Sequence, residues 1–231
     1  MTTLQRPWDQ ATSIWATETG LSVFTGLLAL EVFVVAPLAS LGLLGTGPID
    51  VVFTLLLVCG ALALHTGQLL RLLAGSVVGI AIGLRWMAAW HPSAWMVATG
   101  SLLAVVTLAC FAAIVLQRVF EPGPVTRHRI HGAVCAYLLC GLMWAAAYTC
   151  IEQVFPQAFS LPSGAGPGDN LRSRFVYFSF ITLTTVGYGD ILPVHPLART
   201  FVVAEALTGQ LFPAIIIGGL VSSALHARLK S

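Results

Sequence analysis

Six long apolar stretches, separated by short polar segments, limit what this chain can fold into. Of its 231 residues, 57% are hydrophobic and only 9% are charged, whereas about a quarter of the residues in a soluble domain are charged. A helix needs about 20 apolar residues to cross a hydrocarbon layer about 30 Å thick. The stretches that meet or approach this length are 22–44, 51–72, 75–90, 94–116, 132–151 and 197–225. The sequence therefore predicts an all-α membrane protein with six transmembrane helices.

Two further segments refine this topology. The apolar segment 175–183 is too short to cross the membrane and predicts a re-entrant helix, which protein or a water-filled cavity must surround. The stretch 156–170, which is rich in Pro and Gly, predicts an extracellular loop before that helix. We place the boundary between the second and third spans at 71–75, and a short interfacial helix before residue 20.

The basic residues favour one orientation in the membrane. With the N-terminus in the cytoplasm, six spans bring the C-terminus back to the same side. Seven of the eleven Lys and Arg residues then lie on the cytoplasmic side, as expected, namely Arg6, Arg71, Arg118, Arg127, Arg129, Arg228 and Lys230. The net charge of +2 is too small to indicate a nucleic-acid partner. We expect a multi-pass protein of the cell membrane with both termini cytoplasmic.

The segment 184–190 carries the most specific motif, Thr-Thr-Val-Gly-Tyr-Gly-Asp, directly after the short apolar helix and before the last span. Here the sequence resembles the potassium-channel pore family, in its six-helix type. The family's selectivity filter, which binds K+, matches Thr185, Val186, Gly187, Tyr188 and Gly189. Backbone carbonyls replace the water shell of the ion, and glycines permit the left-handed conformations that point successive carbonyls at one axis. The resemblance covers about 132–225.

The resemblance implies an assembly of four chains. One filter strand cannot enclose an ion, so a chain with a single motif requires a fourfold symmetric homotetramer. We expect the Thr185 hydroxyl at the inner mouth, with the Val186 and Tyr188 side chains pointing away from the axis into surrounding protein. K+ is the permeant ligand, and no other cofactor is expected.

The chain divides accordingly into five predicted parts. These are an N-terminal segment 1–21, a four-helix front domain 22–118, a cytoplasmic linker 119–131, a pore domain 132–225 and a short tail 226–231. A soluble ligand-binding domain is not expected. The sequence does not decide whether the front helices pack on their own pore domain or on that of a neighbour.

The last span contains the predicted gate. Gly209 lies nineteen residues after Asp190, the spacing at which many family members place the glycine about which their inner helix bends. Pro213 removes a backbone donor and can kink the same helix. Close helix packing is the alternative role for Gly209. We expect an apolar ring that closes the pore by dewetting, with Phe212, Ile215, Ile216 and Ile217 as candidates.

Three residues are predicted to support the filter: Tyr177, Thr184 and Asp190. The descent of the short helix and the return of the filter have comparable lengths, which brings Tyr177 beside Asp190. We expect a hydrogen bond between them, worth about 1.5–3 kcal/mol as a charge-assisted contact; the alternative is an Asp190 that is simply solvated. Ile181 stands where some family members have a buried carboxylate, so no acidic partner is expected behind the filter.

The fourth span argues against a voltage sensor. Residues 94–116 include no charged side chain. One elementary charge crossing the membrane gains about 2.3 kcal/mol per 100 mV, and steep gating needs several such charges. We therefore expect a channel that is not intrinsically voltage-gated.

The sequence leaves open the roles of three polar residues in the first three spans. Glu31 should face protein or water, where it pairs with a cation or senses protons. His65 is either a satisfied buried histidine or a titrating group. Arg85 lies near the outer end of its span and can extend its charge to the interface.

Two other functional classes compete with a channel. The first is a membrane sensor or scaffold whose pore-like domain does not conduct. The second is a membrane enzyme, which needs converging nucleophile, base or metal ligands. The histidines are scattered instead, at His65, His91, His128, His131, His195 and His226, and we expect no enzymatic activity.

Overall fold

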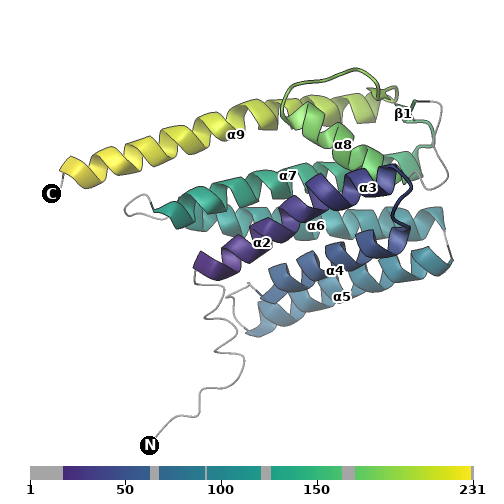
Figure 1. Ribbon diagram of the computed structural model, residues 1–231, viewed down its shortest axis with the longest axis horizontal. Helices are drawn as coiled ribbons and strands as arrows, with labels where there is room; N and C mark the ends of the chain where they lie inside the picture. Colours follow the sequence, from purple (N-terminus) through teal and green to yellow (C-terminus); the bar gives the residue numbers. More distant parts are fainter. Residues whose placement is uncertain (1–17, 63–67, 92, 121–125, 163–169, 230–231) are drawn as a thin grey trace, which may run out of the picture.

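The computed structural model describes residues 18–62, 68–91, 93–120, 126–162 and 170–229, and these form an almost entirely helical protein (Figure 1). The helical elements are α2 (Glu18–Leu30), the π-helix η1 (Glu31–Val35), α3 (Ala36–Ser40), α4 (Thr46–Leu62), α5 (Gln68–Trp90), α6 (Ala94–Val119), α7 (Arg127–Val154), α8 (Leu171–Leu183) and α9 (Pro196–Leu229). Two short strands, β1 (Phe159–Ser160) and β2 (Leu192–Pro193), pair antiparallel. β1 lies within the loop predicted at 156–170, between α7 and α8.

Four helical segments are long and apolar enough to cross a membrane: Gly20–Ser40, Ala94–Val119, Arg127–Val154 and Pro196–Gly219. The second and third predicted spans correspond to shorter apolar helices, Gly47–Ala61 and Gly75–Ala88. The chain is therefore an all-α, multi-pass membrane protein, and the number of six spans stays a prediction.

The predicted boundary at 71–75 between the second and third spans is wrong. α4 already ends at Leu62, and α5 begins at Gln68 and continues through this segment. Gly75 is the one helix-disfavouring residue there, and a single glycine costs a helix only about 1 kcal/mol. His65 and the N-terminal residues 1–17 lie outside the described residues, so the predictions for them stay untested.

The first span ends four residues earlier than predicted, at Ser40 instead of Leu44. Gly42 has a φ of 72°, a left-handed conformation that suits glycine. The amide of Gly42 donates to Ala39 O at 3.0 Å, and that of Leu43 donates to Leu38 O at 3.1 Å. This pair of bonds is a Schellman motif, which satisfies the last carbonyls of the helix.

A proline that follows the π-helix η1 explains its hydrogen-bond pattern. Pro37 has no backbone N–H and cannot continue the regular ladder of hydrogen bonds. The amide of Ala36 instead donates to Glu31 O, five residues back. Short π-helical turns often occur at functional sites, and this one brings the Glu31 side chain into the protein interior.

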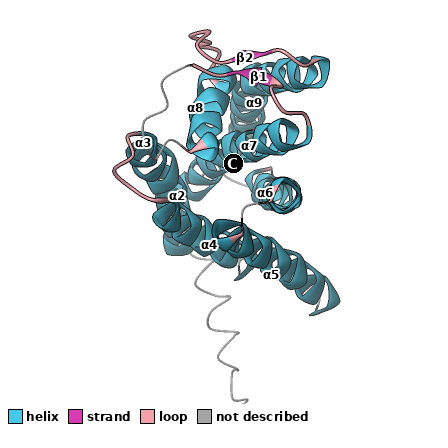
Figure 2. Cartoon of the chain, turned by 90° about the vertical axis from the view of Figure 1, so that its right-hand side faces the viewer, coloured by secondary structure: helices cyan, strands magenta, loops and turns pink. Residues whose placement is uncertain are grey.

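We call α2 to α6 the front bundle and α7 to α9 the pore half. Seen end-on in Figure 2, α7, α8 and α9 lie together, and α2 and α6 separate them from α4 and α5. One hydrophobic core joins both groups, with Phe24 of α2, Leu56 of α4, Phe111 of α6 and Leu139 of α7 among its buried members. The front bundle therefore packs on the pore half of its own chain, and the division into two domains stays a prediction.

Candidate functional site

The short helix α8 positions the candidate site. It begins four residues before the predicted 175–183 because Asn170 caps it: the Asn170 side chain accepts a hydrogen bond from the backbone N–H of Arg172 at 3.0 Å. The helix ends at Leu183, as predicted, and the filter loop Thr184 to Asp190 follows directly. α8 does not cross the protein; it enters beside α7 and α9 and stops (Figure 1).

The filter loop adopts the left-handed conformations that the motif predicted for its glycines. The φ angles are 52° at Gly187 and 78° at Gly189. Thr185 also has a positive φ, 61°, which is rare for a β-branched residue. Such backbone strain concentrates at functional sites, where the surrounding structure enforces it.

The backbone amides of the loop turn back to α8. Thr185 N donates to Thr182 O at 2.9 Å, and the amides of Val186 and Gly187 both donate to Ile181 O, at 2.8 and 3.1 Å. No hydrogen bond within the described residues reaches the carbonyl oxygens of the loop from Thr185 to Gly189. The start of the loop is thus fixed to the end of α8, while its carbonyls remain available to a ligand.

The side chains of the loop are not enclosed by their own chain. Val186 is 53% exposed and Tyr188 73% exposed. We expected surrounding protein to cover both, and a single chain does not supply it.

A residue that the sequence reading missed contacts the start of the loop. The Gln210 amide on α9 donates to the Thr185 hydroxyl at 3.2 Å. Residues seven apart share a helix face, so Ile217 lies on the side of α9 that carries Gln210. A polar side chain in the middle of an apolar span was the available signal.

The four gate candidates do not lie on one face of α9. Ile216 is buried beside Val119 and Ala133, and Phe212 packs against the same cluster, its ring 5.4 Å from that of Tyr137. Ile215 and Ile217 are exposed. Phe212 and Ile216 thus contact α6 and α7 in this conformation, and the apolar ring for which all four residues are candidates stays a prediction.

Gly209 allows α8 and α9 to meet. A Cβ added at Gly209 would lie 1.9 Å from the carbonyl oxygen of Leu183, at the end of α8. α9 continues as an α-helix through Gly209 and Pro213. The geometry supports the packing alternative for Gly209, and a role of Gly209 and Pro213 as a hinge stays a prediction.

Asp190 at the end of the loop lies near Tyr177. Burial, and to a lesser extent the Asp190 carboxylate, raises the pKa of the Tyr177 hydroxyl, and the hydrogen bond expected between the two side chains stays a prediction. Thr184 behaves differently, because its hydroxyl donates to Phe180 O at 2.6 Å, within α8. Whether these contacts brace the filter stays a prediction.

A buried carboxyl group that the sequence reading overlooked lies behind α8. Glu205 of α9 is 0% exposed; the Tyr148 hydroxyl donates to one of its oxygens, and the Ser179 hydroxyl lies 2.5 Å from the other. Ser179 also lies 2.7 Å from Gly141 O. An acidic residue inside a predicted span was the signal, because a carboxylate facing lipid is costly. Glu205 contacts the middle of α8 and not Asp190.

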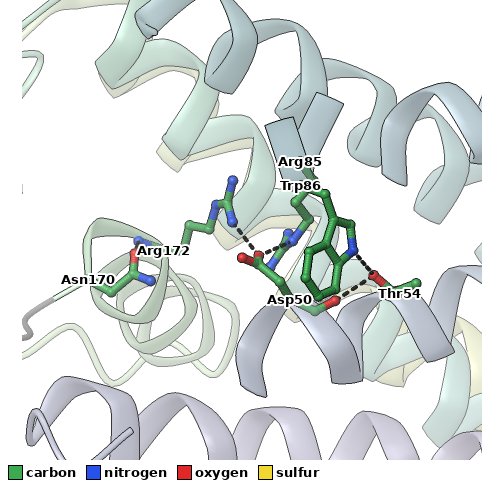
Figure 3. Close-up of polar contacts among 6 residues, drawn as sticks. All are labelled: Asp50, Thr54, Arg85, Trp86, Asn170 and Arg172. Atoms are coloured by element: carbon green, nitrogen blue, oxygen red, sulfur yellow. Dashed lines mark hydrogen bonds and ion pairs between the residues drawn. The ribbon is translucent and has the colours of Figure 1, made fainter. Parts of the chain in front are cut away.

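A second buried carboxylate, Asp50 of α4, joins three elements (Figure 3). Its Oδ1 lies 2.5 Å from Nε of Arg85 on α5 and 2.9 Å from Nη1 of Arg172 on α8. The expectation that Arg85 extends to the membrane interface is wrong, because this ion pair holds its side chain at 10% exposure.

Glu31 lies close to these charges. It lines a cavity together with Arg85 and Arg172, and its Oε2 has no hydrogen-bond partner in the described part of the chain. Glu31 thus faces protein, as expected, without a direct ion pair.

Among the described residues, no group of three or more His, Cys, Asp and Glu side chains gathers to hold a metal ion.

The region around the filter loop matches known channels. Residues 136–224 match the family described as Ion channel. Two pore potassium channel c of Oryza sativa subsp. japonica is 35% identical over 92 residues, or 39% of this chain and 20% of the relative. Inward rectifier potassium channel Kirbac3.1 of Paramagnetospirillum magnetotacticum is also 35% identical over 92 residues, or 40% of this chain and 26% of the relative. Protein LctB of Geobacillus stearothermophilus is 42% identical over 55 residues, or 24% of this chain and 40% of that protein.

The family match lies within the pore half. The chain spans only 20% and 26% of the two potassium channels' length. No solved structure matches this chain. Over residues 136–224 the chain is similar to ion channels, with potassium channels among its relatives, in agreement with the family resemblance of the filter motif.

Proposed function

We propose that this chain is a subunit of a potassium-selective channel that conducts K+ passively across the cell membrane. The observation that carries the proposal is the filter loop. Gly187 and Gly189 are left-handed, the amides of Val186 and Gly187 bond back to α8, and the carbonyls from Thr185 to Gly189 are left without hydrogen-bond donors among the described residues. Oxygen ligands of this kind can replace the hydration shell of K+.

Four copies form the pore in this proposal. One loop offers carbonyls from one side only, and its Val186 and Tyr188 side chains are uncovered. In the most apolar 18-residue stretch of α9, 17% of the residues are buried, against 67% in the corresponding stretch of α7. A closed ring of four chains would cover the exposed faces of α9 and surround the ion with four loops.

The proposed topology has six spans with both termini in the cytoplasm. The start of α2 and the end of α9 lie at the same end of the molecule, opposite the filter loop (Figure 1). Asp190 then lies at the outer mouth and Gln210 below the filter. We place the gate at Ile217, which shares the Gln210 face of α9, with Gly209 and Pro213 as the candidate bend.

We further propose that voltage does not gate the channel intrinsically. α6, the fourth predicted span, carries one basic residue, Arg118, in its last turn. A helix without charges inside the membrane gains almost nothing from the transmembrane potential.

Ion flux through the purified chain in liposomes tests the proposal. We expect K+ flux that Ba2+ and quaternary ammonium ions block, a reversal potential that follows K+ over Na+, and weak voltage dependence. Gly187→Ala should abolish the flux, because the φ of 52° disfavours a side chain although no atom lies within 4 Å of the added Cβ. Gly79→Ala, which meets equally open space in α5 at an ordinary φ, is the matched control.

The outcomes separate the competing functions. Equal permeability to Na+ and K+ would contradict selectivity. A folded, tetrameric protein that passes no ions would favour the alternative of a membrane sensor or scaffold with a non-conducting pore-like domain.

A further inference from the structure

A single carboxylate oxygen connects the front bundle to the pore helix α8. Asp50 Oδ1 accepts hydrogen bonds from Arg85 at 2.5 Å and from Arg172 at 2.9 Å. Figure 3 shows Asp50 between the two arginines. The residue is 2% exposed, and Arg172 is 122 positions away in the sequence. This contact therefore joins two separate parts of the fold.

Asp50 is held firmly within the front bundle. The Thr54 hydroxyl donates to the backbone carbonyl of Asp50 at 2.5 Å, and the indole N–H of Trp86 donates to Thr54 at 3.2 Å. The guanidinium of Arg85 lies 4.1 Å from the centroid of the Phe53 ring, within cation–π range. The position of the Asp50 carboxylate is thus set by α4 and α5.

Arg172 belongs as firmly to α8. It is the second residue of the helix, and its backbone N–H bonds to the capping Asn170. At the other end of α8, Ile181 O accepts the amides of Val186 and Gly187. A helix of 13 residues is a rod about 20 Å long, so a tilt imposed on its first turn also moves the filter loop.

We propose that Asp50 is a positioning residue for the filter: through its ion pair with Arg172, the front bundle fixes the first turn of α8, and movements of the front bundle reach the filter along this helix. The inference rests on the proposed channel function and identifies where the front bundle regulates it. It gives the front bundle a direct route to the filter that does not pass through α9.

The cluster of Asp50, Arg85 and Arg172, which we call the junction, supplies a matched control. Arg85 and Arg172 bind the same oxygen, but Arg85 pairs within the front bundle and Arg172 pairs across to α8. Glu31 lines the same cavity as both arginines, so the junction and Glu31 together hold two guanidinium and two carboxyl groups. Arg85→Gln and Arg172→Gln therefore remove the same charge from the same cluster, and only the second removes the contact to α8.

Hydrogen–deuterium exchange of the full chain in liposomes tests the positioning directly. A charge-assisted contact at the first turn predicts that Arg172→Gln raises the exchange rate of the α8 amides about tenfold. Arg85→Gln should leave this rate within about twofold of wild type. The proposal is overturned if α8 exchanges at the wild-type rate in Arg172→Gln, or if the two variants raise it equally.

K+ flux and selectivity of the same samples test the link to the filter. Arg172→Gln should change the K+ to Na+ permeability ratio or the K+ flux several-fold, and Arg85→Gln should not. If Arg172→Gln does not assemble, Arg172→Lys keeps the charge while losing the fork geometry, and the same comparison applies to it. Wild-type protein that passes no K+ would contradict the proposed function, whereas the exchange measurement would still decide the positioning role.

Discussion

Two buried carboxyl groups hold α8, one from the front bundle and one from the pore half. Asp50 holds the first turn through the Arg172 guanidinium, and it binds a second cation, Arg85. Glu205 holds the middle of the helix through the Ser179 hydroxyl, and its other described contact is the Tyr148 hydroxyl. One junction is built from charges and the other from hydrogen bonds to neutral groups.

The difference indicates what each junction needs. Asp50 forms ion pairs with two arginines, and removing one partner of a buried ion pair leaves an uncompensated charge. The hydrogen bonds around Glu205 are complete when it is protonated: Glu205 donates to Ser179, Ser179 donates to Gly141 O, and Tyr148 donates to Glu205. A neutral group of the same shape can preserve this second arrangement, but not the first.

The largest expected effect is that of Asp50→Asn. The amide keeps the shape of the side chain but leaves Arg85 and Arg172 without their counter-charge, which we expect to cost about 3–5 kcal/mol of stability. Thermal unfolding of the protein in detergent micelles, followed by tryptophan fluorescence, measures the loss.

The same chemical change at the other junction is the control. Glu205→Gln can still donate to Ser179 and accept from Tyr148, so we expect it to cost less than about 1 kcal/mol. An equal loss of stability in the two variants would show that charge does not distinguish the junctions.

The second prediction concerns the end of α8, where it meets α9. Gly209→Ala places a Cβ 1.9 Å from the backbone oxygen of Leu183, and backbone cannot move aside as a flexible side chain can. We expect a loss of about 3 kcal/mol and altered gating in single-channel recordings. Gly218→Ala, which has no atom within 4 Å, should behave as wild type. Unchanged gating and stability in Gly209→Ala would remove Gly209 from both its packing and its hinge role.

The pore half could be predicted from the sequence because its signals are local. The filter motif spans seven consecutive residues, and its two glycines have the left-handed conformations that the motif requires. The end of α8 at Leu183 follows from the same stretch. Its start was missed by four residues because the prediction followed the apolar run 175–183, and three of the four preceding residues, Arg172, Ser173 and Arg174, are polar.

The contacts that fix α8 could not be predicted in the same way. Asp50 lies 35 residues from Arg85 and 122 from Arg172, and no periodicity connects such positions. Arg85 was assigned to the interface because the sequence does not reveal a buried partner. Glu205 and Gln210 carried a signal, as polar residues within an apolar span, but their partners Tyr148 and Thr185 are known only from the fold.

The third prediction tests whether Glu205 acts through its hydrogen bonds. Glu205→Leu removes the acceptor of the buried Tyr148 hydroxyl, whereas Ser179 keeps Gly141 O as its partner. One unsatisfied hydroxyl should cost about 2 kcal/mol. Adding Tyr148→Phe should recover most of this loss in thermal unfolding, since no buried hydroxyl is then left unpaired. If the double variant is less stable than Glu205→Leu, the role of Glu205 is not explained by this hydrogen bond.

The smallest expected effect on stability is that of Tyr177→Phe, which leaves α8 in place and removes only the hydroxyl expected to bond to Asp190. Tyr177 is 41% exposed, so water competes for the expected bond. We therefore expect it to contribute about 1 kcal/mol, below the range of about 1.5–3 kcal/mol for hydrogen bonds to charged groups. The effect on function should be larger than this energy suggests, because the carbonyls of the loop repel one another and Asp190 is the last residue that can restrain them. Under sustained activation, the variant should show a faster or altered decay of K+ current, with a melting temperature lowered by only about 2–4 °C. Wild-type decay in Tyr177→Phe would leave Asp190 solvated and the two junctions at Asp50 and Glu205 as the supports of the filter.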